Sequence, residues 1–206
     1  MKGITEAASC ELDIRNSRFL AEAFPVPTQE DARALLKQQK EKYADATHVV
    51  HAFVIGPSGG ILGCSDDGEP SGTAGRPALD VLKGSGITGI MVTVTRWFGG
   101  TLLGTGGLVK AYGDAVKAVL AVTRASELVT VRDFVLEVPY ELHDRVKRAL
   151  DTGGISVSGE EFGTAVTITG SIPETDAEAF SERIISITSG TCRAQLSAST
   201  RTGFKD

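Results

Sequence analysis

The first 125 residues contain apolar runs of two kinds, short alternating ones and longer ones with helical spacing. A strand-like run at 17–24 is stopped by Pro25 and Pro27, and Thr28 then caps a helix that reaches about Ala44. The later pattern predicts, in order, a strand at 48–55, its hairpin partner at 61–64, a short helix from Pro77 to about Gly84, a strand at 87–95 and a long helix that begins near Gly106 or Gly107. The long helix has a single apolar stripe, so we expect it to pack on a sheet.

The pattern changes after a break at 123–126. From there it predicts a strand from Leu128 to Val138, a helix at about 140–151, strands at about 154–159 and 163–170, a helix at 175–187 and a strand at 191–199. This β-α-β-β-α-β order within about 80 residues is typical of the ferredoxin-like unit. We therefore expect an α+β chain of two domains, residues 1–125 and 126–206.

Composition agrees with a folded protein and shows where its charge lies. The chain has 206 residues, of which 41% are hydrophobic and 23% charged, so disorder and a coiled coil are both disfavoured. Residues 1–126 carry 13 Lys and Arg and 13 Asp and Glu, whereas residues 127–206 carry 8 and 13, so the net charge of −5 lies in the second part. Neither part has the basic excess typical of non-specific nucleic-acid binding. The sequence leaves open whether folding brings basic residues together into a patch.

Cysteine usage and hydropathy indicate the compartment. Cys10, Cys64 and Cys192 are odd in number and too far apart for a disulfide framework or a zinc pair. No segment approaches the roughly 18 apolar residues that a membrane span needs. We expect a cytoplasmic protein with reduced thiols and no membrane contact, and the sequence leaves its oligomeric state open.

The first candidate motif is DDGEPSGTAGRP at 66–77, between a predicted strand and a predicted helix. It lies within a segment, 56–113, that holds 16 of the 24 glycines. Its carboxylates, hydroxyls and arginine suit an anion held by backbone amides at the helix N-terminus, or a hard metal ion held by carboxylates. The alternative is a rigid turn in which Asp and Ser side chains cap local backbone groups.

The second candidate motif, TRWFGGTLLGTGGLVKAY at 95–112, follows a buried strand and enters the long helix. Its glycines can present backbone amides at the helix start, with Arg96 and Lys110 available for a negative group. Alternatively, Trp97 and Phe98 fill the core below the loop and the glycines only permit the turn. A further match, GSGITG at 84–89, has the letters of the dinucleotide fingerprint but ends a helix and opens a strand, so we interpret it as a turn.

Histidine adds one more candidate. A hairpin can bring His48 to the loop at 66–69, where Ser71 would complete a nucleophilic arrangement, but no Gly-x-Ser-x-Gly elbow supports it. His48 and His51 point to opposite faces of a strand, which disfavours a shared metal. We therefore assign no catalytic residue, metal or cofactor and favour a protein that is not an enzyme. The candidate binding residues are His48, Asp66, Asp67, Glu69, Ser71, Thr73, Arg76, Arg96, Trp97, Gly106, Gly107 and Lys110.

Three segments together resemble the signature of the IMPACT/YigZ family: ATH at 46–48, the motif at 66–77, and VTRWFGG with LGTGGLVKAY within 94–112. The resemblance covers about residues 15–125. It implies a first domain with the left-handed β-α-β fold that also occurs in a small-subunit ribosomal protein, elongation factor G and the GHMP kinases. Bacterial members also carry a ferredoxin-like domain resembling the last domain of elongation factor G, which suits residues 127–206.

The resemblance implies a role in translation, and two classes of function follow. The first is a regulator that docks on the ribosome, structured RNA or a translation factor through the loops 66–76 and 96–110, acting as one surface. The second is a small-ligand-binding enzyme whose glycine-rich loops hold a phosphate group, with a carboxylate of the first motif as metal ligand or general base. If Gly106 and Gly107 occupy positive φ, we expect alanine at either position to reduce stability.

Overall fold

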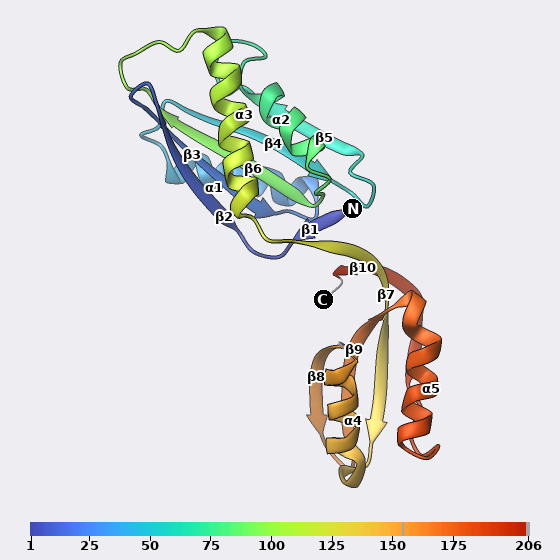
Figure 1. The fold of residues 1–206 in the computed structure, drawn as a ribbon. Helices are drawn as coiled ribbons and strands as arrows, with labels where there is room; N and C mark the ends of the chain where they lie inside the picture. The colour runs from blue at the N-terminus through green and yellow to red at the C-terminus, as the bar shows by residue number, and fades with distance from the viewer. Residues whose placement is uncertain (154, 205–206) are drawn as a thin grey trace. The chain divides into compact units, whose positions relative to one another are not determined.

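The chain forms two compact α+β units (Figure 1), the first spanning Met1–Glu127 and the second beginning at Leu128. The computed structural model describes residues 1–153 and 155–204. Both units contain antiparallel sheets covered by helices, which confirms the two-domain α+β architecture expected from the sequence. The more specific fold names stay predictions.

The first unit is built on a five-stranded antiparallel sheet. Its strand order is β2 (Ala8–Ile14), β3 (Ser17–Pro25), β6 (Ile90–Trp97), β4 (His48–Ile55) and β5 (Ile61–Ser65). Strand β6 lies at the centre because its sequence, IMVTVTRW, is rich in β-branched residues that suit a position buried on both faces, and its first seven residues are buried.

Helices cover both faces of this sheet (Figure 1). Helices α2 (Gly75–Gly84) and α3 (Thr105–Val122) lie on one face, where the apolar stripe of α3 joins the main core. Helix α1 (Gln29–Lys42) packs on the other face, and it begins at the predicted cap because Thr28 and Asp31 form a reciprocal capping box. The predicted packing of the long helix on a sheet is therefore confirmed.

Two N-terminal strands were not predicted. The half-buried strand β2 alternates in the sequence ASCELDI, a period-two signal that marks an edge strand with one face toward a core. The three-residue strand β1 (Lys2–Ile4) pairs with residues 125–127 at the start of β7 (Ala125–Val138), and Lys2 also forms a parallel bridge with Ile87. The strand expected at 87–95 begins instead at Ile90, because Gly86 and Gly89 adopt positive φ and form a turn before it.

The second unit has the predicted β-α-β-β-α-β order. Its elements are β7 (Ala125–Val138), which begins in the first unit, α4 (Tyr140–Thr152), β8 (Ser156–Phe162), β9 (Val166–Pro173), α5 (Ala177–Ile187) and β10 (Gln195–Phe204), with a 3-10 turn, η1 (Glu174–Asp176), before α5. The antiparallel strand order is β10-β7-β9-β8. The expected strand at 154–159 begins at Ser156, and position 154 lies outside the described residues.

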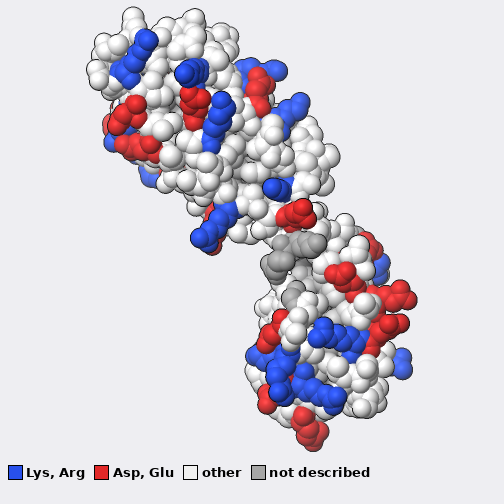
Figure 2. Space-filling model, in the orientation of Figure 1, with Lys and Arg blue, Asp and Glu red and all other residues white. Residues whose placement is uncertain are grey.

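None of the helices in the described part of the chain is long and apolar enough to cross a membrane. On the visible face of both units, Lys and Arg side chains are interspersed with Asp and Glu (Figure 2). This interspersion agrees with the zero charge sum of residues 1–126.

Candidate functional site

The two sequence motifs meet at one cavity in the first unit, which we call the motif cleft. His48 of β4 pairs with Arg96 of β6 in the sheet, and the loops that follow β5 and β6 close over this pair. The cavity has a volume of about 430 Å³. Its polar lining residues are Thr47, His48, Glu69, Arg96 and Thr105, its apolar ones are Pro70, Phe98, Leu102, Leu103 and Leu108, and Gly68 and Gly104 complete the wall.

A buried ion pair forms the floor of the motif cleft. Arg96 Nη1 donates to Glu69 Oε1 at 2.6 Å, and the side chains of Arg96 and Glu69 are only 6% and 3% exposed. The hydroxyl of Tyr112 in α3 donates to the same carboxylate oxygen at 2.7 Å, and Arg96 Nη2 donates to Ser17 Oγ at 3.3 Å. Burial and the Glu69 carboxylate raise the pKa of Tyr112 well above its ordinary value. Tyr112 is therefore a neutral donor that ties α3 to the sheet.

The orientation of His48 follows from its neighbours. Its Nδ1 lies 2.8 Å from the backbone oxygen of Asp67, and a carbonyl oxygen can only accept, so Nδ1 carries a proton. The other ring nitrogen, Nε2, lies 3.9 Å from Glu69 Oε2 at the floor of the cleft. The first motif thus fixes the imidazole through its backbone, and Nε2 is the atom that faces the buried carboxylate.

The rim of the motif cleft is apolar and exposed. Phe98 is 45% exposed and Leu102 is 81% exposed, which are high values for large apolar side chains. Leu103 and Leu108 are buried beneath them, and the guanidinium carbon of Arg96 lies 5.6 Å from the centre of the Phe98 ring. A partner group entering the cleft would therefore meet an aromatic and aliphatic surface before it reached the charged floor.

The other carboxylates of the first motif have fixed internal partners. Asp66 accepts hydrogen bonds from the backbone N–H groups of Gly72, Ala74 and Gly75, which closes the turn before α2. Burial raises the pKa of Asp66, but the three backbone hydrogen bonds together outweigh it and hold the pKa below its ordinary value. Asp67 accepts from the backbone N–H of Val49 at 2.7 Å and pairs with Lys40. The rigid, self-capped turn is therefore present in this loop.

The remaining candidates of the first motif lie outside the cleft lining. The Thr73 hydroxyl donates to the backbone oxygen of Pro70 at 2.6 Å, and Arg76 Nε donates to Asp80 Oδ1 on the exposed surface of α2. Ser71 is exposed. The structure thus divides this motif into a part that builds the turn and a part, around Glu69, that reaches the cleft.

Of the second motif, Arg96 reaches the cleft and Trp97 does not. Trp97 is half-buried beside α1, where its Nε1 donates to Asp45 Oδ2 at 2.9 Å and the Arg18 guanidinium lies 3.8 Å from its ring centre. The alternative in which Trp97 and Phe98 fill the core below the loop is therefore wrong, because the Trp97 ring is held by polar and cationic neighbours at the end of β6 and Phe98 is exposed.

Gly106 and Gly107 are not the glycines of this loop that adopt positive φ. Gly106 and Gly107 lie in the first turn of α3 without positive φ, and Lys110 is exposed one turn further along. The left-handed positions in this loop are Gly100 at φ +84° and Gly104 at φ +73°. The premise that linked Gly106 and Gly107 to stability is thus wrong, because the tight turn is completed before α3 begins.

Several residues that build the motif cleft are not among the candidate residues drawn from the sequence. Tyr112, Phe98 and Leu102 lie inside the second motif, and their signal was a tyrosine within the apolar stripe of the long helix and two large apolar residues in a glycine-rich loop. Ser17 gave no signal, because its contact with Arg96 depends on the pairing of β3 with β6. Within residues 1–153 and 155–204, no group of three or more His, Cys, Asp or Glu side chains is arranged to hold a metal ion.

Comparison with known proteins establishes the family. Residues 15–120 match the Impact N-terminal domain, and residues 136–191 match a domain of unknown function, DUF1949. An IMPACT family member of Haemophilus influenzae is 36% identical over 188 residues, which cover 90% of this chain and 91% of that protein. YigZ of Escherichia coli is 32% identical over 180 residues, covering 86% and 88%. The chain belongs to the IMPACT family, which confirms the resemblance found in its motifs.

A solved structure shares the architecture of the whole chain. It is described as the crystal structure of a hypothetical protein, with a TM-score of 0.63, 31% sequence identity and 96% of each chain covered.

Proposed function

We propose that this IMPACT family member is a cytoplasmic, translation-associated regulatory protein that acts by binding, and that the motif cleft receives its partner. The observation that carries the proposal is the convergence of both motifs on one cavity with an exposed apolar rim and a buried charged floor. An apolar pocket with a few convergent polar groups is the usual form of a recognition site.

The internal bonding of the carboxylates favours binding over chemistry at this loop. Asp66 and Asp67 hold backbone N–H groups, and Glu69 accepts from Arg96 and Tyr112. A general base must instead reach a proton on a substrate. These side chains therefore make the cleft rigid, and a rigid site loses less conformational entropy when a partner binds.

The ribosome is the partner that we propose. The family resemblance indicates translation, and the relatives that match nearly the whole chain are bacterial. Phe98 and Leu102 at the rim suit a stacked base or an inserted apolar side chain. Because Arg96 is neutralised by Glu69 and residues 1–126 sum to zero charge, we expect few phosphate contacts and a weak dependence of binding on salt.

Co-sedimentation with purified bacterial ribosomes tests this proposal. We expect the wild type to sediment at low and at physiological salt, and Phe98→Ala and Leu102→Ser to weaken the affinity about tenfold, as loss of an anchoring apolar side chain does. Val122→Ser is the matched control, because Val122 is 56% exposed at the far end of α3. Equal sedimentation of all four proteins, or none of the wild type, would contradict the proposal.

One observation favours a second candidate function, a phosphate-binding enzyme. Gly104 at φ +73° and Thr105 place the N-terminus of α3 in the cleft wall, where backbone N–H groups suit an anion. A thermal-shift screen of nucleotides and phosphosugars, with and without magnesium, tests this candidate. A ligand that raises the melting temperature of the wild type, and whose effect is lost in Leu102→Ser, would favour it over ribosome binding.

A further inference from the structure

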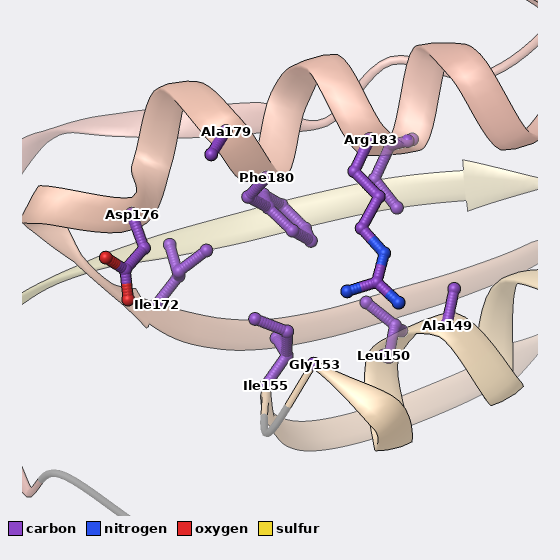
Figure 3. Close-up of a pocket in the computed structure, with 10 residues that line it drawn as sticks. Ala149, Leu150, Gly153, Ile155, Ile172, Asp176, Ala179, Phe180 and Arg183 are labelled. Carbon is purple, nitrogen blue, oxygen red and sulfur yellow. The ribbon is translucent and has the colours of Figure 1, made fainter.

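The second unit contains a cavity of its own, which we call the α4–α5 pocket. It lies between the end of α4, strand β9 and helix α5 (Figure 3) and has a volume of about 220 Å³. Its apolar wall is formed by Ala149, Leu150, Ile155, Ile172, Phe180 and Ile184. A dry apolar cavity of about 150 Å³ holds benzene, so this pocket has room for a somewhat larger apolar group.

A cationic side chain lies at one end of this pocket. Figure 3 shows the guanidinium of Arg183 extending from α5 toward Ala149 and Leu150. Within the described part of the chain, this guanidinium forms no hydrogen bond or ion pair. Arginine presents a planar fork of N–H donors that matches a carboxylate bidentately. The pocket therefore has an available anion receptor beside its apolar wall.

The backbone of α4 leaves space for this guanidinium. Gly153 has a negative φ of −83°, outside the left-handed region that favours glycine, so the local backbone does not require glycine there. A Cβ at position 153 would lie 3.1 Å from Arg183 Nη1. The missing side chain thus lets the guanidinium lie across the end of α4, within reach of a ligand in the pocket.

The opposite end of the pocket carries a negative charge. Asp176 precedes α5 by one residue, seven positions before Arg183, which corresponds to about 10 Å along a helix axis. Figure 3 places Asp176 and Arg183 at the two ends, with Ile172 and Phe180 between them. Asp176 Oδ1 accepts a hydrogen bond from the Thr175 hydroxyl at 3.0 Å. A second negative charge on a ligand would meet Asp176 and be disfavoured.

We propose that the α4–α5 pocket binds a small apolar monocarboxylate. The carboxylate lies on the Arg183 guanidinium, and an aliphatic or aromatic body fills the space between Ile172, Phe180 and Leu150. The size of the cavity selects ligands of about six to nine non-hydrogen atoms, and Asp176 selects against dicarboxylates. This site is separate from the motif cleft and does not depend on the function proposed for it.

Arg183 also lies near the C-terminus of α4, where a cation stabilises the helix dipole. A purely structural role would lower the melting temperature of an Arg183 variant and leave its ligand preferences unchanged. The test therefore measures affinity as well as stability, on the full chain, and it includes one pair of probes, hexanoate and hexanamide, that have the same size and differ in charge.

Isothermal titration with hexanoate, hexanamide, 1-hexanol and glutarate, all within the size range of the cavity, provides this test. We expect hexanoate to bind tightest and the dicarboxylate glutarate at least tenfold more weakly. Arg183→Gln should reduce the affinity for hexanoate about tenfold or more, because it removes a charge-assisted hydrogen bond, and should leave that for 1-hexanol unchanged. The control is Arg145→Gln, an exposed arginine of α4 outside the pocket lining.

Two further variants separate the charge from the apolar wall, and the melting temperature of each is measured beside its affinity. Gly153→Ala should displace the guanidinium, from which its Cβ would lie 3.1 Å, and weaken hexanoate binding while sparing 1-hexanol. Phe180→Leu changes a core residue and should weaken hexanoate and 1-hexanol together. Equal affinities for hexanoate and hexanamide, no binding of any probe, or an affinity for hexanoate that Arg183→Gln does not change would each overturn the proposal.

Discussion

At the scale of single residues, the cleft depends on a charge pair that has almost no access to water. Arg96 Nη1 donates to Glu69 Oε1, Tyr112 adds a neutral donor to the same oxygen, and the buried Arg96 Nε has no hydrogen-bond partner among the described residues. Breaking such a pair by removing one charge costs more than the pair itself contributes, because the other charge is left buried without a partner. Arg96→Ala is therefore a test of stability and not, as the sequence alone would suggest, of partner binding.

Glu69→Gln should lower the free energy of unfolding by about 3–5 kcal/mol, because it leaves the Arg96 charge buried and unpaired. Urea denaturation followed by circular dichroism measures this loss. The matched control is Asp80→Asn, which breaks the exposed Arg76–Asp80 pair and should cost less than about 1 kcal/mol. A similar loss of unfolding free energy in the two variants would contradict the conclusion that the Glu69–Arg96 pair is buried and that each charge depends on the other.

At the scale of elements, one turn and one loop position the site. The turn before α2 is closed by Asp66, whose folded-state pKa is lowered by three backbone hydrogen bonds despite a raising effect of burial. A carboxylate with a lowered folded-state pKa contributes stability above its unfolded pKa, and this contribution is lost as the pH falls through the folded pKa. The loop after β6 depends on Gly99, where a Cβ would lie 1.8 Å from the backbone oxygen of Asn16.

The contribution of Asp66 should depend on pH in one direction. The difference in unfolding free energy between the wild type and Asp66→Asn should be constant above about pH 5 and should shrink as the pH falls below the ordinary value of 3.8. Chemical denaturation of both proteins at several pH values measures this difference. A difference that stays constant down to pH 3 would contradict the capping role.

The glycines of the second motif should differ sharply in their tolerance of alanine. Gly99→Ala should destabilise by about 1–3 kcal/mol or more, because the new methyl group meets the backbone of Asn16. Gly106→Ala should be neutral or stabilising by up to about 1 kcal/mol, because position 106 is helical and open. Thermal unfolding of both variants measures these changes in stability. A loss of stability in Gly106→Ala as large as that in Gly99→Ala would contradict the structure.

At the scale of the whole molecule, the sequence predicted more of the fold than of the site. Strong periodicity located α3, β6 and the β-α-β-β-α-β order of the second unit, because the apolar residues of each element pack into the core of its own unit. Strand β1 escaped prediction because three residues carry no periodic signal, and it forms through long-range pairing with the start of β7 and a bridge to Ile87. The partners of Asp66 are set by the geometry of the turn, and those of Arg96 by the register of its strand. Because residue types alone show neither, the sequence left backbone capping and ligand binding as two open alternatives for these side chains.

The most direct test of the central claim places a photo-crosslinking amino acid at the cleft rim. Position 102 is the site, and position 122, at the far end of α3, is the control. On irradiation with purified bacterial ribosomes at physiological salt, we predict a saturable crosslink to a ribosomal component from position 102, removed by excess wild-type protein, and none from position 122. Equal crosslinking from both positions, or none from position 102 in a folded protein, would contradict the assignment of the motif cleft as the partner-binding surface.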